Sequence, residues 1–156
     1  MIERGEKIRA STRFSDAIHI LCFLKVYEEA RITSDLLSSS IGISPVMVRR
    51  LMGNLRQAGL VQTTQGTAQP RLARDLQKIT LYDVYLAVEE SDGPHPLFNV
   101  NPDTNPQCKV GGHIQPILAE VYQEAQAAAM IRFNNVTVAD IVDQINLKLH
   151  QEKLQD

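Results

Sequence analysis

Residues 41–74 of the chain contain a helix with explicit start and stop signals. Ser44 is a favoured N-cap, and Pro45 suits the first helical position, where a missing N–H costs no hydrogen bond. Gly59 can adopt the left-handed conformation that ends many helices. Between these signals, apolar side chains recur every three or four residues, which predicts a single buried stripe. The stripe consists of Val48, Leu51, Met52 and Leu55.

The opposite face of this helix is basic and has no carboxylate. A rotation of about 100° per residue puts Val46, Arg50, Gly53 and Gln57 on the outer face, and Met47, Arg49 and Asn54 on its flanks. Residues 60–64 alternate as in a strand, residues 65–70 are rich in turn formers, and residues 71–74 can return as a second strand. A capped basic helix followed by a hairpin is typical of a recognition helix and its wing.

Charge is distributed unevenly along the chain. Residues 1–75 contain eleven Lys and Arg against seven Asp and Glu, whereas residues 76–156 contain five against eleven. The basic half includes the capped helix, and residues 44–74 contain five arginines and no acid. This segregation favours a module that presents a basic face to a polyanion. A merely solvated basic surface is the alternative.

Two further helices are predicted before the basic helix. One begins at Thr12 or Ser15 and continues to about residue 28, with Cys22 at the margin of its core stripe. A short one begins at Thr33 or Ser34 and continues to about residue 40, with Leu36 and Leu37 inward. The three-residue turn 42–44 then joins it to the basic helix, as in a helix-turn-helix unit. The predicted fold class is therefore mainly α with a small β-hairpin, in the form of a winged helix-turn-helix domain.

The second half of the chain predicts a helix, a loop and two more helices. Thr80 and Asp83 form a capping-box-like start for a helix to about residue 90, and Thr137 with Asp140 caps the last helix. Prolines interrupt residues 91–107, whereas residues 114–133 have the pattern of a long C-terminal dimerisation helix. A second copy of the chain can cover the apolar face of this long helix. That face consists of Ile114, Ile117, Leu118, Val121, Ala125 and Ala128.

Several segments together resemble the Rrf-two family of winged-helix bacterial transcription regulators. They read STRFSDAIHIL, GISPVMVRRLMGNLRQAGLV, KITLYDVYLAVEE, NPQCKVGGHIQPIL and VTVADIV, in that order. Within the family, the chain resembles the YwnA-like branch, which lacks the iron–sulfur cysteines. The resemblance implies a homodimeric repressor that binds a pseudo-palindromic double-stranded DNA operator. The expected organisation is a polar leader (1–10), a winged helix-turn-helix DNA-binding domain (11–90), a loop (91–111), and the dimerisation and C-terminal helices (112–156).

Recognition chemistry follows from the types of side chain on the basic helix. Arg50 can bond guanine O6 and N7 in a bidentate manner, which discriminates bases by ~1 to 3 kcal/mol. Arg49 can contact a base or a phosphate, and Val46 and Met47 can contact thymine methyl groups. Other polar side chains are assigned to phosphates, namely Ser44, Asn54, Arg56, Gln57 and Arg71. In the wing, Gln65 and Gly66 stand where the family has an arginine followed by glycine, which weakens the expected reading of the minor groove.

An iron–sulfur cluster is not expected, because the family's cluster-binding members use three cysteines in the loop before the long helix. This chain has only Cys108 there, and one thiolate cannot hold a cluster. Cys108 is instead a candidate redox switch, since Lys109 and the following helix start favour its thiolate. A structural cysteine is the alternative, and a metal site of Cys108, His95 and His113 matches no established spacing.

Motifs of common enzyme classes are missing from the sequence. It contains no Gly-x-Ser-x-Gly, no His-Glu-x-x-His and no phosphate-binding glycine loop. No apolar run approaches the ~18 residues that span a bilayer, and the N-terminus has no apolar signal core. We therefore expect a cytoplasmic protein that is not an enzyme and has no membrane partner. A winged helix that binds protein is the rival interpretation, and a small-molecule or protein effector stays open.

Overall fold

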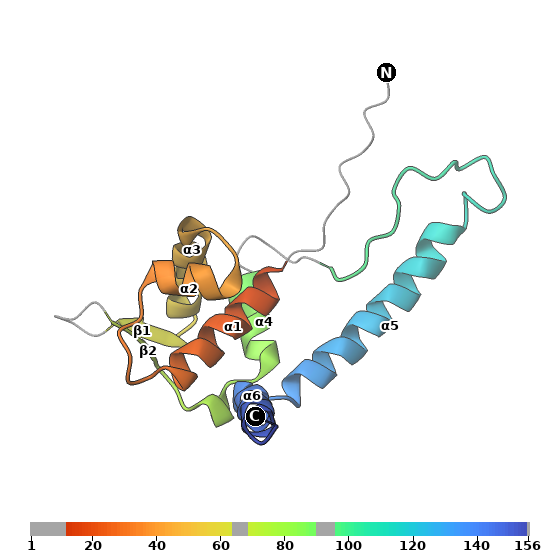
Figure 1. Cartoon of the computed structure of the whole chain (residues 1–156). Coiled ribbons are helices and arrows are strands. Elements are labelled where there is room, and N and C mark those ends of the chain that lie inside the picture. Colours follow the sequence, from red (N-terminus) through yellow and green to blue (C-terminus); the bar gives the residue numbers. More distant parts are fainter. Residues whose placement is uncertain (1–11, 64–68, 90–95, 156) are drawn as a thin grey trace.

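A computed structural model describes residues 12–63, 69–89 and 96–155 of the chain (Figure 1). The helices are α1 (Arg13–Val26), α2 (Ser34–Ile41), α3 (Pro45–Gln57), α4 (Leu81–Glu89), α5 (Ile114–Asn134) and α6 (Val138–Lys153). The strands β1 (Val61–Thr63) and β2 (Pro70–Leu72) form an antiparallel hairpin, and a 3-10 helix, η1 (Leu76–Lys78), follows it. The predicted class, mainly α with a small hairpin, is confirmed.

Local signals set the limits of α2 and α3. The Thr33 hydroxyl accepts the N–H of Leu36 at 3.1 Å, and Gly42 ends α2 with φ +81°. The Ser44 hydroxyl accepts the N–H of Met47 at 3.3 Å, and Gly59 follows α3 with φ +72°. A side chain at either glycine would be strained, because L residues rarely adopt a positive φ. The predicted start and stop of the basic helix are thus confirmed.

The core lies between α1, α3, α4 and the start of α6. Leu21, Val48, Leu51 and Leu55 are fully buried, together with Val138 from α6. Figure 1 shows α1, α2 and α3 gathered beside the hairpin. The apolar stripe of α3 therefore packs into this core, and the opposite face of the helix points outward.

Three predicted details are wrong. Leu36 is exposed while Leu37 is buried, because the face that α2 packs against the neighbouring helices carries Leu37 and not Leu36. Helix α1 ends at Val26 rather than near residue 28. It begins directly after Thr12, as predicted, although the Thr12 side chain does not make a capping hydrogen bond. Arg74 lies beyond β2, where its guanidinium donates to the carbonyl oxygens of Ala58 and Gly59, both at 3.4 Å. Both carbonyls come after the last residue of α3, so neither has a partner within the helix.

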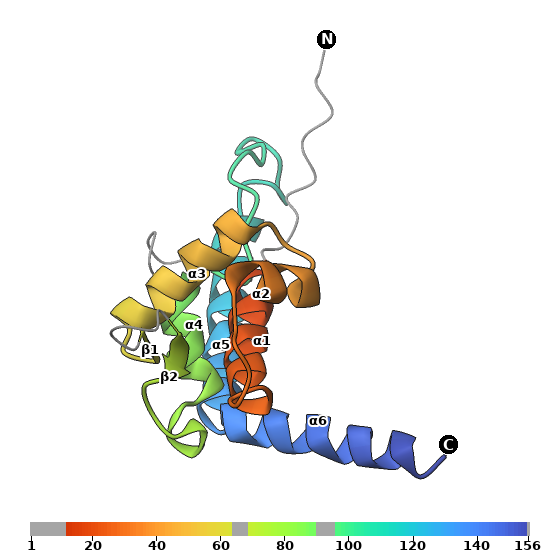
Figure 2. The same cartoon turned by 60° about the vertical axis from the view of Figure 1, so that its left-hand side comes forward.

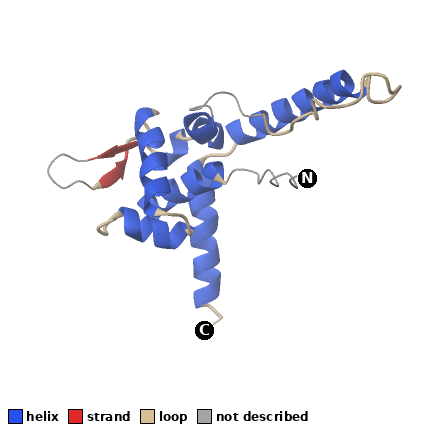
Figure 3. Cartoon of the chain, turned by 90° about the horizontal axis from the view of Figure 1, so that it is seen from above, coloured by secondary structure: helices blue, strands red, loops and turns tan. Residues whose placement is uncertain are grey.

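Helix α6 starts inside the core and then leaves it. Its capping box is complete, since Thr137 accepts the N–H of Asp140 and the Asp140 carboxylate accepts the N–H of Thr137. An isolated bridge joins Thr80 to Thr137, and the N–H of Val138 donates to the carbonyl of Ile79 at 2.9 Å. Figures 2 and 3 show α5 and α6 leaving the body in different directions. The domain boundaries remain predictions, and the leader 1–10 lies outside the described residues.

Candidate nucleic-acid interface

The outer crest of α3 presents one apolar and two polar side chains to solvent. Val46 is 65% exposed, and Arg50 and Gln57 are also exposed. Beneath them Val48 and Leu51 are fully buried. The buried stripe fixes the rotation of α3 about its axis. The crest, which is the outer face with Val46, Arg50 and Gln57, is therefore held toward solvent. A helix presented in this way has the shape that fits the major groove of DNA.

The two flanks of α3 differ in charge. Arg49 and Arg56 are exposed on the flank that faces the start of α2, where both line a hollow with Arg31 and Gln69. Met47 and Asn54 are half-buried on the other flank, and the exposed Ser44 serves as the N-cap. The structure thus brings the predicted α3 residues onto one outward surface, in which the cations lie toward α2.

The base of the hairpin contributes a contact that the sequence did not predict. The side-chain oxygen of Gln69 accepts the N–H of Ile32 at 3.0 Å, which ties the chain before α2 to the wing. Arg71 lies opposite Gln62 and is half-buried, and its Nη1 has no hydrogen-bond partner among the described residues. Gln65 lies outside the described residues. The sequence analysis also did not include Arg31 among the candidate binding residues. Its only signal in the sequence was its position as a cation just before the Thr33 cap.

The long helix α5 carries an uncovered apolar face. None of its described residues is buried, Ile117 is 61% exposed and Val121 is 53% exposed. Ala125 and Ala128 are exposed beside them, while Ile114 and Leu118 are half-buried. Within the described chain, Ile117, Val121 and the two alanines of this predicted dimerisation face are left uncovered. An exposed apolar face of this kind is typical of a contact with another molecule.

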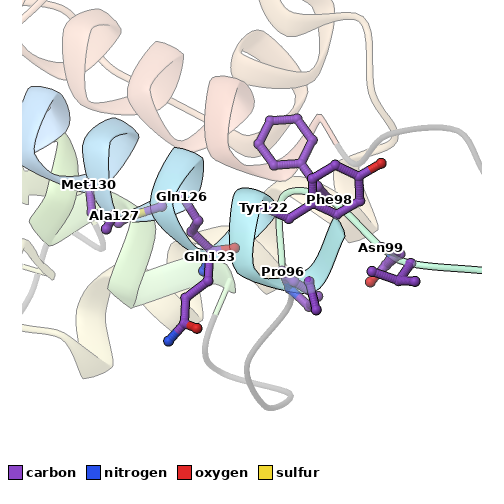
Figure 4. A pocket seen from close by; sticks show the side chains of 10 residues that line it. Pro96, Phe98, Asn99, Tyr122, Gln123, Gln126, Ala127 and Met130 are labelled. Atoms are coloured by element: carbon purple, nitrogen blue, oxygen red, sulfur yellow. The ribbon is translucent and has the colours of Figure 1, made fainter. Parts of the chain in front are cut away.

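A second hollow, of about 540 Å³, lies on another side of α5 (Figure 4). The N–H of Leu97 donates to the side-chain oxygen of Gln126 at 3.0 Å, which holds the loop against the helix. The rings of Phe98 and Tyr122, which both line the hollow, are tilted by 41° to each other with 5.6 Å between centroids. Its lining has no charged side chain and combines apolar groups with amides, among them Gln123. The hollow is therefore suited to an uncharged group rather than to a phosphate.

The two cysteines have different surroundings. Cys22, at the margin of the predicted core stripe, is buried, and burial raises the pKa of its thiol from 9.0 to about 11. Cys108 is exposed in the loop before α5, where backbone N–H groups of Gly111 and Val110 lower the pKa of its thiol. His113 is bound through Nδ1 to the carbonyl of Lys109 at 2.7 Å, and His95 lies outside the described residues.

Comparison with known proteins identifies the family to which the chain belongs. The sequence profile of the Rrf2 family, described as an iron-dependent transcriptional regulator, matches residues 10–144. The chain belongs to the Rrf2 family. YwnA of Bacillus subtilis (strain 168), named as an HTH-type transcriptional regulator, is 30% identical over 135 residues, which are 86% of this chain and 98% of YwnA. The predicted family is confirmed, and an Rrf2 protein of this kind is a transcriptional regulator and not an enzyme.

Solved structures agree with this fold. A crystal structure described as a DNA-binding protein shares 28% identity with a TM-score of 0.61, over 83% of this chain and 97% of that one. A transcriptional regulator from Lactobacillus plantarum shares 22% identity with a TM-score of 0.69, over 93% of this chain and 99% of that one. CymR, the cysteine regulator of Bacillus subtilis, shares 21% identity with a TM-score of 0.61, over 87% and 97%. The last two likenesses bear on the fold alone.

The two cysteines of this Rrf2 chain do not supply the set of thiolates that holds an iron–sulfur cluster. The sequence has two cysteines, and Cys22 is buried in α1 while Cys108 is exposed in the loop before α5. Among the described residues no three side chains of His, Cys, Asp or Glu come together as ligands. The described helices also include none with both the length and the apolar character needed to cross a bilayer.

Proposed function

We propose that this Rrf2 protein is a sequence-specific repressor that binds a pseudo-palindromic operator with α3 in the major groove. The observation that carries the proposal is the crest of α3, where Arg50 stands on a helix whose opposite face is fully buried. A guanidinium held there can form the bidentate bond to guanine that discriminates bases. The hairpin beside it lies where a wing would approach the neighbouring groove.

We propose further that two copies of the chain pair through α5, so that each places one α3 on half of the operator. Ile117 and Val121 expose apolar surface, and burial of this surface against a second chain is favourable. The exposed alanines on the same face are small, so a second helix can approach closely. A twofold pair of recognition helices matches the symmetry of a pseudo-palindromic site.

The test is selection of bound sequences from random duplex DNA, followed by mobility-shift titrations on a recovered site and on a scrambled one. Arg50→Ala should weaken binding to the recovered site about tenfold or more, with little change on the scrambled one. Lys148→Ala, which removes one exposed cation from α6, is the matched control and should leave both affinities nearly unchanged. Failure of the unaltered protein to bind any duplex would favour a winged helix that binds protein instead.

No iron–sulfur cluster is part of this proposal, since the cysteines do not provide its ligands. An effector is part of it, and the hollow beside Tyr122 supports an uncharged small molecule in that role. Because the chain contains no tryptophan, tyrosine emission would report binding there, and Tyr122→Ala should remove the response.

A thiol-responsive sensor is a second candidate function. Cys108 is exposed, and the N–H groups of Gly111 and Val110 favour its thiolate, which is the nucleophilic form. Attack of this thiolate on hydrogen peroxide would form an S–O bond and break the O–O bond, which gives a sulfenic acid and a hydroxide ion that takes a proton from solvent. Peroxide should then change the affinity for DNA in the unaltered protein and in Cys22→Ala, but not in Cys108→Ser. An equal response of all three proteins would remove this candidate.

A further inference from the structure

A hollow of about 390 Å³ lies where the start of α2, one flank of α3 and the base of the hairpin meet. Arg31, Arg49 and Arg56 contribute to its lining, and none of its lining residues is acidic. In the part of the chain that the structure describes, no carboxylate forms an ion pair with any of the three. Three cations therefore share one concave site whose described lining includes no acidic side chain.

Two of these cations are fixed by the geometry of α3. Arg49 and Arg56 are seven residues apart, so two helical turns bring them to nearly the same angular position. Met52 lies between them and is 7% exposed, which anchors this flank to the core. Arg49 is about 100° away from Arg50 around the helix axis. Arg49 thus belongs to the hollow, whereas Arg50 belongs to the crest.

The third cation comes from the chain before α2. Arg31 directly precedes Ile32, whose N–H is held by the side chain of Gln69 at 3.0 Å. Ile32 is itself 3% exposed. Ile32 therefore holds the segment that carries Arg31 beside the hollow, through its N–H bond to Gln69 and through its buried side chain.

Hydroxyl groups complete the lining. Thr33 and Ser34 both line the hollow at the start of α2. The Thr33 oxygen accepts the N–H of Leu36, which leaves its own O–H available as a donor. Guanidinium groups and hydroxyl donors around a concave surface are the chemistry that binds phosphate oxygens. An uncharged ligand would leave three like charges close together without compensation.

We propose that this hollow binds a phosphate of the DNA backbone, with Arg31, Arg49 and Arg56 as its cationic ligands. The inference rests on the proposed function and adds residues to it. It assigns Arg49 to the backbone rather than to a base, so that Arg49 sets the register of α3 while the crest reads the sequence. It also makes Arg31, far from α3 in the sequence, part of the interface.

The salt dependence of binding tests this assignment. Each phosphate that a protein neutralises adds about −0.9 to the slope of log K against log salt concentration. Arg31 is one of three cations at this site, so Arg31→Ala should reduce the magnitude of this slope by up to about 1 for each chain that engages the DNA. It should also weaken binding about three- to tenfold at 0.1 M salt. Arg31→Lys should restore part of the slope. Lys148→Ala is the control for loss of one charge, and circular dichroism of each variant checks that it is folded.

Comparison of two duplexes tests the role of Arg49. Arg49→Ala should weaken binding to a selected site and to its scrambled version by the same factor, whereas Arg50→Ala should act on the selected site. A slope for Arg31→Ala equal to that of Lys148→Ala would overturn the phosphate site while leaving the proposed function intact. A loss confined to the selected duplex for Arg49→Ala would also overturn it. Absence of DNA binding by the unaltered protein would overturn both.

Discussion

Cys22 and Cys108 show how a single residue type acquires opposite chemistry from its surroundings. The thiol of Cys22 is packed among the core side chains of α1, and the loss of solvation there disfavours its charged form. Cys108 faces solvent, and backbone N–H groups stabilise its thiolate. The same side chain is therefore inert in the core and nucleophilic in the loop.

The raised pKa of Cys22 predicts a loss of stability in alkali. The thiol ionises near 9.0 in the unfolded chain and at about 11 in the folded one. Its contribution is therefore complete below about pH 9 and is lost as the pH rises toward 11. The free energy of unfolding should fall over this range by up to about 1.4 kcal/mol per pH unit from this group.

Urea unfolding at several pH values measures this effect. Cys22→Ala should start from a lower stability, because it leaves a cavity, but should fall less steeply between pH 9 and 11. Parallel curves for the two proteins would mean that other groups cause the alkaline loss.

At the scale of elements, helix α6 combines an anchored start with an exposed end. Val138 and Val142 pack into the core, and the capping box satisfies the first N–H groups. Farther along, Leu147 is 57% exposed and Leu149 is 44% exposed. The cap and the first two turns therefore supply most of the stability of this helix within one chain.

Thr137→Ala should lower the free energy of unfolding by about 0.5 to 2 kcal/mol, because it leaves the N–H of Asp140 without its acceptor. Urea denaturation at neutral pH measures the loss. Thr137→Ser should restore most of the stability, since a serine hydroxyl can make the same bond. Ser39→Ala, at an exposed position inside α2, serves as the control, and an equal loss there would show that the cap contributes nothing specific.

At the scale of the whole molecule, α5 is the helix that makes the least buried contact within a single chain. It has 21 residues, which is about 30 Å of helix, and none of them is buried. Its contact with the body is concentrated near its end, where the ring of Phe133 meets Phe14 at 5.0 Å between centroids. A helix of this length with one apolar face gains stability when that face is covered.

Val121→Asp should therefore weaken self-association about 100-fold or more, because it would place an unpaired charge in the proposed dimer interface. Sedimentation equilibrium measures the change in mass. Gln123→Asp adds the same charge on the opposite side of α5 and should leave the dimer intact. A monomeric unaltered protein, or equal effects of the two substitutions, would contradict pairing through this face.

The sequence by itself determined the elements whose signals are local. Ser44, Pro45 and Gly59 define the limits of α3 because capping and turn preferences act within a few residues. The spacing of Val48, Leu51 and Leu55 then decided which face of the helix is buried. Arg50 could be assigned to the outer surface on that ground alone.

Only the tertiary structure decided what depends on contacts between distant segments. The tertiary structure placed Arg31 beside Arg49 through the turn of α2 and the hydrogen bond from Ile32 to Gln69. Neither contact leaves a periodic pattern in the sequence from which it could be predicted. The tertiary structure also separated Leu36 from Leu37, because the buried stripe of so short a helix is chosen by the partner helix rather than by its own composition. Helical spacing specifies a face, but the neighbour that covers that face is fixed by packing across the whole chain.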